Sequence, residues 1–136
     1  MMAALVDAGP LVAILDRSDP HHSACVDAMR SLQPPLLTVW PVLTEAIYLL
    51  SASWRAQREL LGDVIVGALK VLPLDEAAVP RIRDLMYKYR DLPMDLAGAA
   101  LVHVAEREQI RRVFTLDRRD FSLYRPARLG QFQIVP

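Results

Sequence analysis

The chain has 136 residues, of which 53% are hydrophobic and 24% charged, and its 16 basic residues balance 16 acidic ones. This length suits one globular domain over residues 1–136, and zero net charge argues against a purely electrostatic coat for nucleic acid. The lone Cys25 excludes an internal disulfide and a zinc site built from several thiolates.

No stretch of the sequence predicts a membrane span or a secretion signal. The longest charge-free run, residues 31–44, is interrupted by prolines and is shorter than the ~20 apolar residues that a span needs. The N-terminus has no basic segment and reaches an aspartate at position 7. We therefore expect a cytoplasmic protein with no membrane partner.

The first half of the sequence alternates short apolar runs with segments of helical periodicity. The run Ala3–Val6 predicts a buried strand, and Leu11–Asp16 predicts a short helix after it. Asp19, which is followed by a proline, predicts the N-cap of a second helix. Leu36–Val39 predicts the second strand, and apolar residues at helical spacing between positions 43 and 69 predict further helices.

The second half continues this alternation. Three apolar runs predict the remaining strands: Val71–Leu74, Arg112–Leu116 and, with the weakest pattern, Phe132–Val135. Asp75 predicts the cap of a helix with an apolar stripe from 79 to 89, and Pro93 predicts the start of another. Strands that alternate with helices are typical of a parallel sheet covered on both faces, so we expect an α/β fold.

Acidic residues follow the predicted strands at positions that a parallel sheet brings together. Asp7 ends the first strand, and Asp117 lies just past the fourth. Glu45 lies one turn into the helix after the second strand, while Asp91 and Asp95 flank the start of the helix that Pro93 opens. Because ligands bind outside the carboxyl ends of parallel strands, we expect acids from four elements at one rim of the sheet.

Carboxylates gathered without a lysine among them repel one another unless a cation lies between them. Oxygen ligands of this kind suit Mg²⁺ or Mn²⁺, and such an ion can polarise a phosphodiester and ready a water for attack. The acids therefore predict metal-assisted hydrolysis of a phosphodiester. Each acid alone also has a structural interpretation, Asp7 as a turn residue and Asp117 as part of a solvated charged run.

Four segments in this order carry a family pattern: L-V-D-A-G-P-L at 5–11, T-E at 44–45, Y-R-D-L-P-M-D-L-A at 89–97 and T-L-D-R-R-D-F at 115–121. With these segments the chain resembles PIN-domain ribonucleases, in particular the toxin subunits of VapBC-type toxin–antitoxin pairs. The resemblance implies a three-layer α/β/α PIN-like fold with a central parallel sheet of four or five strands. It also implies a Mg²⁺- or Mn²⁺-dependent endoribonuclease that cleaves RNA, forms a homodimer and is inhibited by a small antitoxin.

The resemblance also implies roles for individual residues. Asp7, Glu45 and Asp117 match the first, second and fourth acids of the family. Asp7 would be the central metal ligand, while the other two would bind metal directly or through water and position the attacking water. Thr115 matches a small polar residue that helps to orient the site. At the third acid the family pattern reads M-D-x-A-D-A, whereas this chain has Gly98 there, so Asp95 becomes the candidate for that catalytic and metal-binding place.

Arginines concentrated around the fourth predicted strand are candidate contacts for RNA. They are Arg111, Arg112, Arg118, Arg119, Arg125 and Arg128. Guanidinium groups pair well with backbone phosphates, although a solvated basic face offset by neighbouring acids is an equal interpretation.

Two further hypotheses stay open beside the nuclease. Gly98 favours a weakened or inactive PIN domain that binds RNA or an antitoxin without cleaving. A phosphotransfer domain with a phosphorylated aspartate fits less well, because no second aspartate lies next to Asp7 and no lysine ends the fourth strand.

Overall fold

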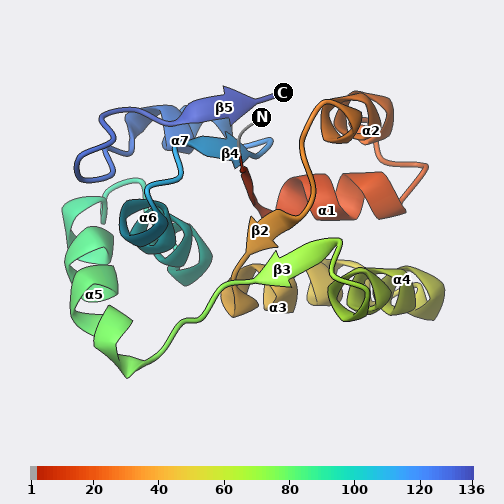
Figure 1. Ribbon diagram of the computed structural model, residues 1–136, viewed down its shortest axis with the longest axis horizontal. Coiled ribbons are helices and arrows are strands. Elements are labelled where there is room, and N and C mark those ends of the chain that lie inside the picture. Colours follow the sequence, from red (N-terminus) through yellow and green to blue (C-terminus); the bar gives the residue numbers. More distant parts are fainter. Residues whose placement is uncertain (1–2) are drawn as a thin grey trace.

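Five parallel strands form one sheet in the computed structural model, which describes residues 3–136 (Figure 1). The strands are β1 (Leu5–Val6), β2 (Leu36–Thr38), β3 (Leu69–Val71), β4 (Arg112–Phe114) and β5 (Gln133–Val135). Their order is β3-β2-β1-β4-β5, and every neighbouring pair is parallel. The α/β class and the parallel sheet predicted from the sequence are confirmed.

Helices cover both faces of this sheet. They are α1 (Ala8–Leu15), α2 (His22–Arg30), α3 (Trp40–Leu49), α4 (Trp54–Ile65), α5 (Val79–Lys88), α6 (Leu96–Glu108) and α7 (Arg118–Leu123), with a short 3₁₀ turn η1 (Glu76–Ala78) before α5. Helices α1 and α2 lie on one side of the sheet and α5 and α6 on the other, which gives the expected three layers (Figure 1). No helix within residues 3–136 is long and apolar enough to cross a membrane.

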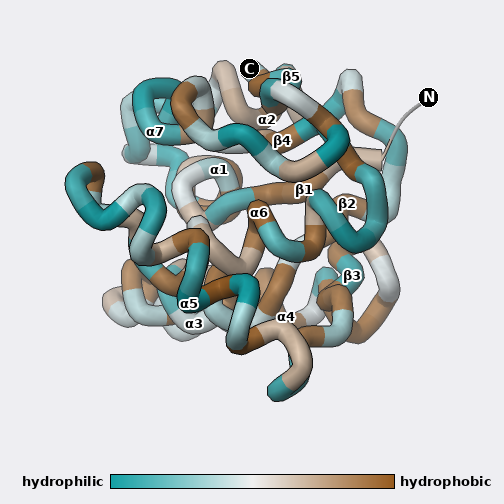
Figure 2. Tube along the Cα trace, turned by 90° about the vertical axis from the view of Figure 1, so that its left-hand side faces the viewer, coloured by the Kyte–Doolittle hydropathy of each residue, from teal (hydrophilic) through white to brown (hydrophobic). Residues whose placement is uncertain are grey.

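The core lies between the central strands and helix α6. Leu5 and Val6 of β1 and Val113 and Phe114 of β4 are fully buried, and the apolar trace of β1 runs through the middle of the molecule (Figure 2). Helix α6 is buried from Ala97 to Glu106 on nearly every side, His103 excepted. Its many alanines let the helix pack closely, so its N-terminus lies beside the ends of the strands.

The third strand lies at Leu69–Val71 and not at Val71–Leu74, so this predicted boundary was wrong. Gly67, with a φ of 84°, follows the end of α4 and ends the helical conformation of the backbone. The strand can therefore begin two residues later. The last ladder bond beyond β3 runs from the N–H of Leu72 to Thr38, at 2.8 Å. Pro73 then has no N–H with which to continue the ladder.

Helix starts also differ from the prediction. The first helix begins at Ala8 and not at Leu11, and α6 begins at Leu96, three residues after Pro93, because the preceding aspartates cap them. Asp19 accepts a hydrogen bond from the N–H of His21 and forms a turn, and it does not cap α2. Helix α7 was not predicted.

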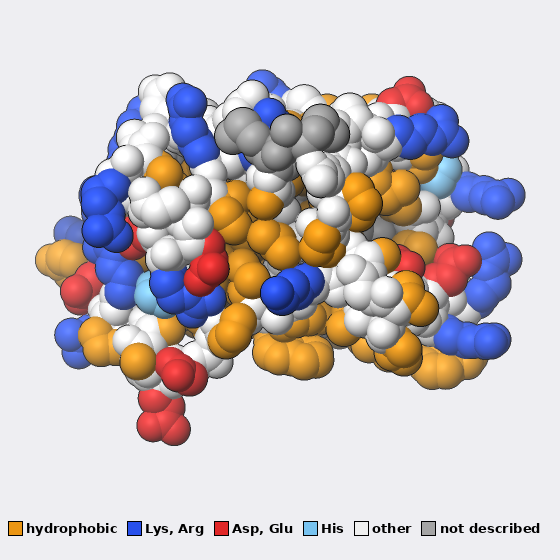
Figure 3. Space-filling model, in the orientation of Figure 1, with side chains coloured by type: hydrophobic (Ala, Val, Ile, Leu, Met, Phe, Trp, Pro, Cys, Tyr) orange, Lys and Arg blue, Asp and Glu red, His pale blue; other side chains and the backbone are white. Residues whose placement is uncertain are grey.

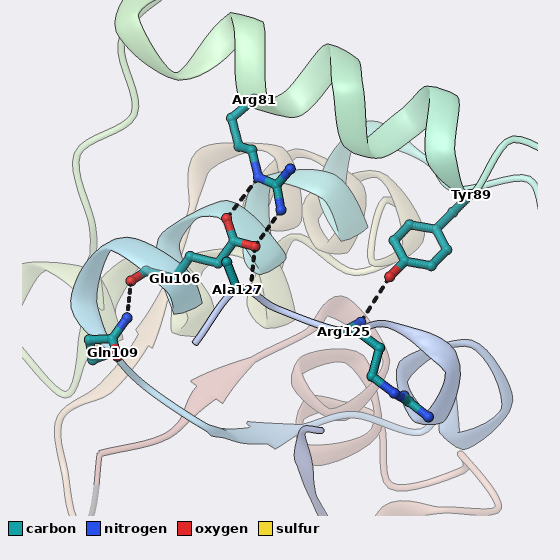
Figure 4. Close-up of polar contacts among 6 residues, drawn as sticks. All are labelled: Arg81, Tyr89, Glu106, Gln109, Arg125 and Ala127. Atoms are coloured by element: carbon teal, nitrogen blue, oxygen red, sulfur yellow. Dashed lines mark hydrogen bonds and ion pairs between the residues drawn. The ribbon is translucent and has the colours of Figure 1, made fainter. Parts of the chain in front are cut away.

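A half-buried ion pair fixes the C-terminal segment to α5 and α6 (Figure 4). Arg81 donates from Nε to Oε1 of Glu106 at 2.9 Å and from Nη2 to Oε2 at 2.6 Å, and the N–H of Ala127 donates to Oε2 at 2.7 Å. Burial raises the pKa of the Glu106 carboxyl, but the bonds from Arg81 and Ala127 outweigh it and leave that pKa below its usual value. The pair therefore stabilises the fold while Glu106 is charged.

We expect Glu106→Gln to lower the free energy of unfolding at pH 7 by about 2 kcal/mol, because it weakens hydrogen bonds to a buried charged group. Since the folded pKa lies below the ordinary 4.5, the difference from wild type persists above that pH and shrinks as the pH falls through the folded pKa. Urea unfolding from pH 3 to 7 measures it. Asp84→Asn, at an exposed pair with Arg83, is the control, and an equal loss there would contradict the account.

Candidate active site

Acidic side chains from four parts of the chain line a cavity of about 350 Å³ beyond the ends of β1 and β4. All four acids predicted from the sequence are among them: Asp7, Glu45, Asp95 and Asp117. Asp91 is exposed and does not line this cavity. Within residues 3–136 no lysine, arginine or histidine lines it either, so its charge is strongly negative.

Three of these acids are held in place as helix N-caps. Oδ1 of Asp7 accepts from the N–H of Ala8 at 2.9 Å and caps α1. Oδ1 of Asp95 accepts from Gly98 at 2.7 Å to cap α6, and Oδ1 of Asp117 accepts from Asp120 at 3.1 Å to cap α7. The helix N-termini favour these negative charges, and each cap occupies only one of the two carboxylate oxygens.

Thr115 joins two of the acids. Its side chain is fully buried just after β4, and its Oγ1 donates to Oδ2 of Asp7 at 3.0 Å. The same Oγ1 accepts from the N–H of Asp117 at 3.0 Å. Thr115 therefore fixes the end of β1 relative to the start of α7.

The cavity disfavours the charged forms of its own acids. Burial raises the pKa of Asp7, and the charges of Asp95 and Asp117 raise it further, against the hydrogen bonds from Ala8 and Thr115 that lower it. Burial and the charges of Asp7 and Asp95 also raise the pKa of Glu45. A cation in the cavity would relieve this repulsion.

Two residues that sequence reasoning missed also line the cavity. Asp120 adds a fifth carboxylate, whose Oδ1 is buried without a hydrogen-bond partner among residues 3–136, and burial together with the charge of Asp117 raises its pKa. Tyr124, only 3% exposed, lines the cavity from the end of α7. The spacing of Asp117 and Asp120, an N-cap with an acid in the first turn, could have predicted α7.

Gly98 lies where a side chain has little room. A Cβ atom built on Gly98 would lie 3.1 Å from Oδ1 of Asp95 and 3.5 Å from the hydroxyl oxygen of Tyr124. Asp95 therefore reaches the cavity from the N-cap of α6 and not from within the helix. The space beside Gly98 is taken by Asp95 and Tyr124.

The donor set suits a hard divalent cation that the protein holds only in part. Within residues 3–136 no group of three or more His, Cys, Asp or Glu side chains is arranged to hold a metal ion alone. Mg²⁺ is commonly bound through one or two carboxylates, with water and phosphate oxygens completing its shell. Oδ1 of Asp120 lies 3.9 Å from Nε of Arg119 but has no hydrogen-bond partner within residues 3–136, and with the other acids of the cavity it fits such an ion.

Comparisons with known proteins agree with this architecture. The chain is 31% identical over 134 residues to Ribonuclease VapC26 of Mycobacterium tuberculosis, covering 97% of this chain and 99% of that protein. Its fold is similar to the crystal structure of VapC20 of Mycobacterium tuberculosis, described as a sarcin–ricin loop cleaving toxin, with a TM-score of 0.78. That match has 16% sequence identity and covers 86% of this chain and 92% of the other.

A family comparison leads to the same assignment. The PIN domain matches residues 4–128, which include every acid that lines the cavity. The predicted resemblance is confirmed, and the chain belongs to the PIN domain family.

Proposed function

We propose that this protein is a Mg²⁺- or Mn²⁺-dependent endoribonuclease and the toxin of a toxin–antitoxin pair. The observation that carries the proposal is the cavity with five carboxylates and no basic lining residue within the described part of the chain. The identity with Ribonuclease VapC26 supports RNA as the substrate. Asp120 adds a fifth carboxylate to the cavity although position 98 carries none, and this favours an active nuclease over a domain that only binds.

The acids of the cavity have different roles in this proposal, according to their positions. We assign metal binding to Asp7, whose carboxylate accepts a hydrogen bond from Thr115, and to Asp117, whose N–H donates to the same threonine. Asp95 and Glu45 complete the negative wall of the cavity. A divalent ion, when bound, supplies positive charge that draws in the phosphate and polarises its oxygens.

Hydrolysis adds one water across a phosphorus–oxygen bond. The water oxygen forms a bond to phosphorus, the bond to the leaving oxygen breaks, and one proton passes to that oxygen while the other is released. Glu45 and Asp117 orient the attacking water in this scheme, and a carboxylate at that place can accept its proton.

Apolar surface on the α1–α4 side supports the proposed protein partners, an antitoxin and a second copy of the chain. A cavity of about 290 Å³ is lined mainly by apolar side chains of α1, α2 and α4, among them Leu11, Met29 and Leu60. On α4, Trp54 is 68% and Ile65 84% exposed. Hydrophobic side chains also gather over β2, β3 and α3 on the face shown in Figure 3. Exposed apolar groups of this kind mark protein interfaces.

We expect Asp7→Asn to raise the melting temperature of the metal-free protein by about 3 °C, because it removes a buried charge from the repelling cluster while the amide oxygen still caps α1. Adding Mn²⁺ should raise the melting temperature of wild type but not of Asp7→Asn. Differential scanning calorimetry with and without Mn²⁺ measures both effects. A less stable Asp7→Asn protein, or no response of wild type to Mn²⁺, would speak against the site.

We expect wild type to cleave ribosomal or transfer RNA in Mg²⁺ or Mn²⁺, and Asp7→Asn to be slower by about 100-fold or more, because a metal ligand is lost. Gel analysis of cleavage products measures the rates, with chelator as the metal-free control. Asp27→Asn, at an exposed aspartate of α2, is the matched control and should cleave like wild type. Equal cleavage by Asp7→Asn and wild type would refute the proposal.

A further inference from the structure

Tyr124 places a hydroxyl group inside the acidic cavity. Among the side chains of residues 3–136 that line the cavity, Tyr124 has the only hydroxyl group, beside carboxyl and apolar groups. The residue is 3% exposed, and the part of it that is reached from outside lines the cavity. A hydroxyl at the wall of a cavity can donate to a ligand that enters it.

The position of this hydroxyl is fixed from several directions. The ring of Tyr124 makes edge contacts with Tyr89 and Phe121, each at a centroid distance of 5.0 Å. The N–H of Arg125, the next residue, donates to the hydroxyl of Tyr89 at 2.9 Å (Figure 4). The ion pair of Glu106 holds Ala127 shortly after. The hydroxyl is therefore preorganised before any ligand arrives.

The lack of a side chain at Gly98 leaves space for the hydroxyl of Tyr124. The hydroxyl oxygen lies 3.5 Å from the place of a Cβ at position 98, so a larger side chain there would enter the space that the hydroxyl occupies. The glycine lies in the first turn of α6, where helix stability alone favours alanine. The tight distance of 3.1 Å from that Cβ to Oδ1 of Asp95 gives a physical reason for a glycine at this position, and Tyr124 limits the space for any larger side chain.

The hydroxyl keeps its proton in these surroundings. Burial raises the pKa of Tyr124 strongly, and the charges of Asp120, Asp117, Asp95 and Asp7 raise it further. Non-bridging oxygens of a phosphodiester are anionic acceptors, which the carboxylates repel. A neutral O–H donor can bond such an oxygen without repulsion.

We propose that Tyr124 is a phosphate-binding residue, whose hydroxyl donates a hydrogen bond to a non-bridging oxygen of the substrate phosphate, in space that Gly98 leaves open. The inference rests on the proposed metal-dependent nuclease function and adds a contact to the substrate that no carboxylate provides. Because Tyr124 binds phosphate and does not bind the metal, removing its hydroxyl should lower the affinity for phosphate and leave the affinity for the metal unchanged.

Dimethyl phosphate, a small phosphodiester, serves as the probe on the full-length protein. Electron paramagnetic resonance measures Mn²⁺ affinity, and ³¹P relaxation by the Mn²⁺-loaded protein measures dimethyl phosphate affinity. We expect Tyr124→Phe, which keeps the packed ring, to bind Mn²⁺ as wild type does and dimethyl phosphate about 5–10-fold more weakly. Tyr87→Phe, which removes a hydroxyl from an exposed ring of α5 outside the cavity, is the matched control and should change neither affinity.

The outcomes separate this inference from the proposed function. If wild type does not bind Mn²⁺ in the cavity, the nuclease proposal fails and the inference fails with it. If Mn²⁺ binds, but wild type and Tyr124→Phe bind dimethyl phosphate equally, the inference alone is overturned. A loss of Mn²⁺ affinity in Tyr124→Phe would also overturn it, because the hydroxyl would then act on the metal.

A second pair of variants tests the role of Gly98. Gly98→Val crowds Asp95 as well as Tyr124, so it should weaken dimethyl phosphate binding at least as much as Tyr124→Phe. The double variant should be no weaker than Gly98→Val alone, because the valine already removes the contact of the hydroxyl. Gly62→Val, in α4 with no atom within 4 Å of its Cβ, is the control and should bind like wild type. Losses that multiply in the double variant would contradict the shared contact. If Gly98→Val does not fold, the comparison of Tyr124→Phe with wild type tests the proposal by itself.

Discussion

Repulsion among carboxylates around one cavity is the constraint on which this site depends. The fold opposes it locally, because Asp7, Asp95 and Asp117 each cap a helix and accept a backbone hydrogen bond. Thr115 adds a bond to Asp7, yet burial and neighbouring charges still leave the pKa of Asp7 raised. The repulsion that remains lowers the stability of the metal-free protein, and a bound cation would relieve it. Stability at this site is lost in exchange for the concentrated charge that the proposed chemistry needs.

The rest of the fold holds the N-termini of the capped helices at the wall of the same cavity. The parallel order of the sheet brings the ends of β1 and β4 together, since these strands are neighbours. Close packing of α6 carries Asp95 and Gly98 to the same place. Far from the cavity, Glu106 ties the segment after α7 to α5 and α6, and so bears on the position of Tyr124.

Much of this arrangement could be predicted from the sequence because it depends on local patterns. Apolar runs marked all five strands, and Asp7, Glu45 and Asp117 could be placed at the sheet rim from their positions after those strands. Asp95 was also found, but its role as the cap of α6 was not, because Pro93 was taken as the start of the helix. The third strand was displaced because the turn at Gly67 was overlooked.

What could not be predicted depends on tertiary contacts. Helix α7 is six residues long and has one buried residue, Phe121, so it shows no apolar periodicity, and only the spacing of Asp117 and Asp120 marks its start. Without α7, Asp120 looked like part of a solvated charged run and Tyr124 had no assigned place. The closeness of Tyr124 to Gly98 joins positions far apart in sequence, and only packing reveals it.

The central claim is that these carboxylates share a divalent cation. A crystal soaked in Mn²⁺ and measured at the manganese absorption edge tests this claim most directly, because anomalous density locates the ion without reference to activity. The account predicts a peak within bonding distance of Asp7 or Asp117 inside the cavity, about 2.0–2.3 Å from a carboxylate oxygen. Full occupancy of Mn²⁺ elsewhere on the protein, with the cavity empty, would contradict it.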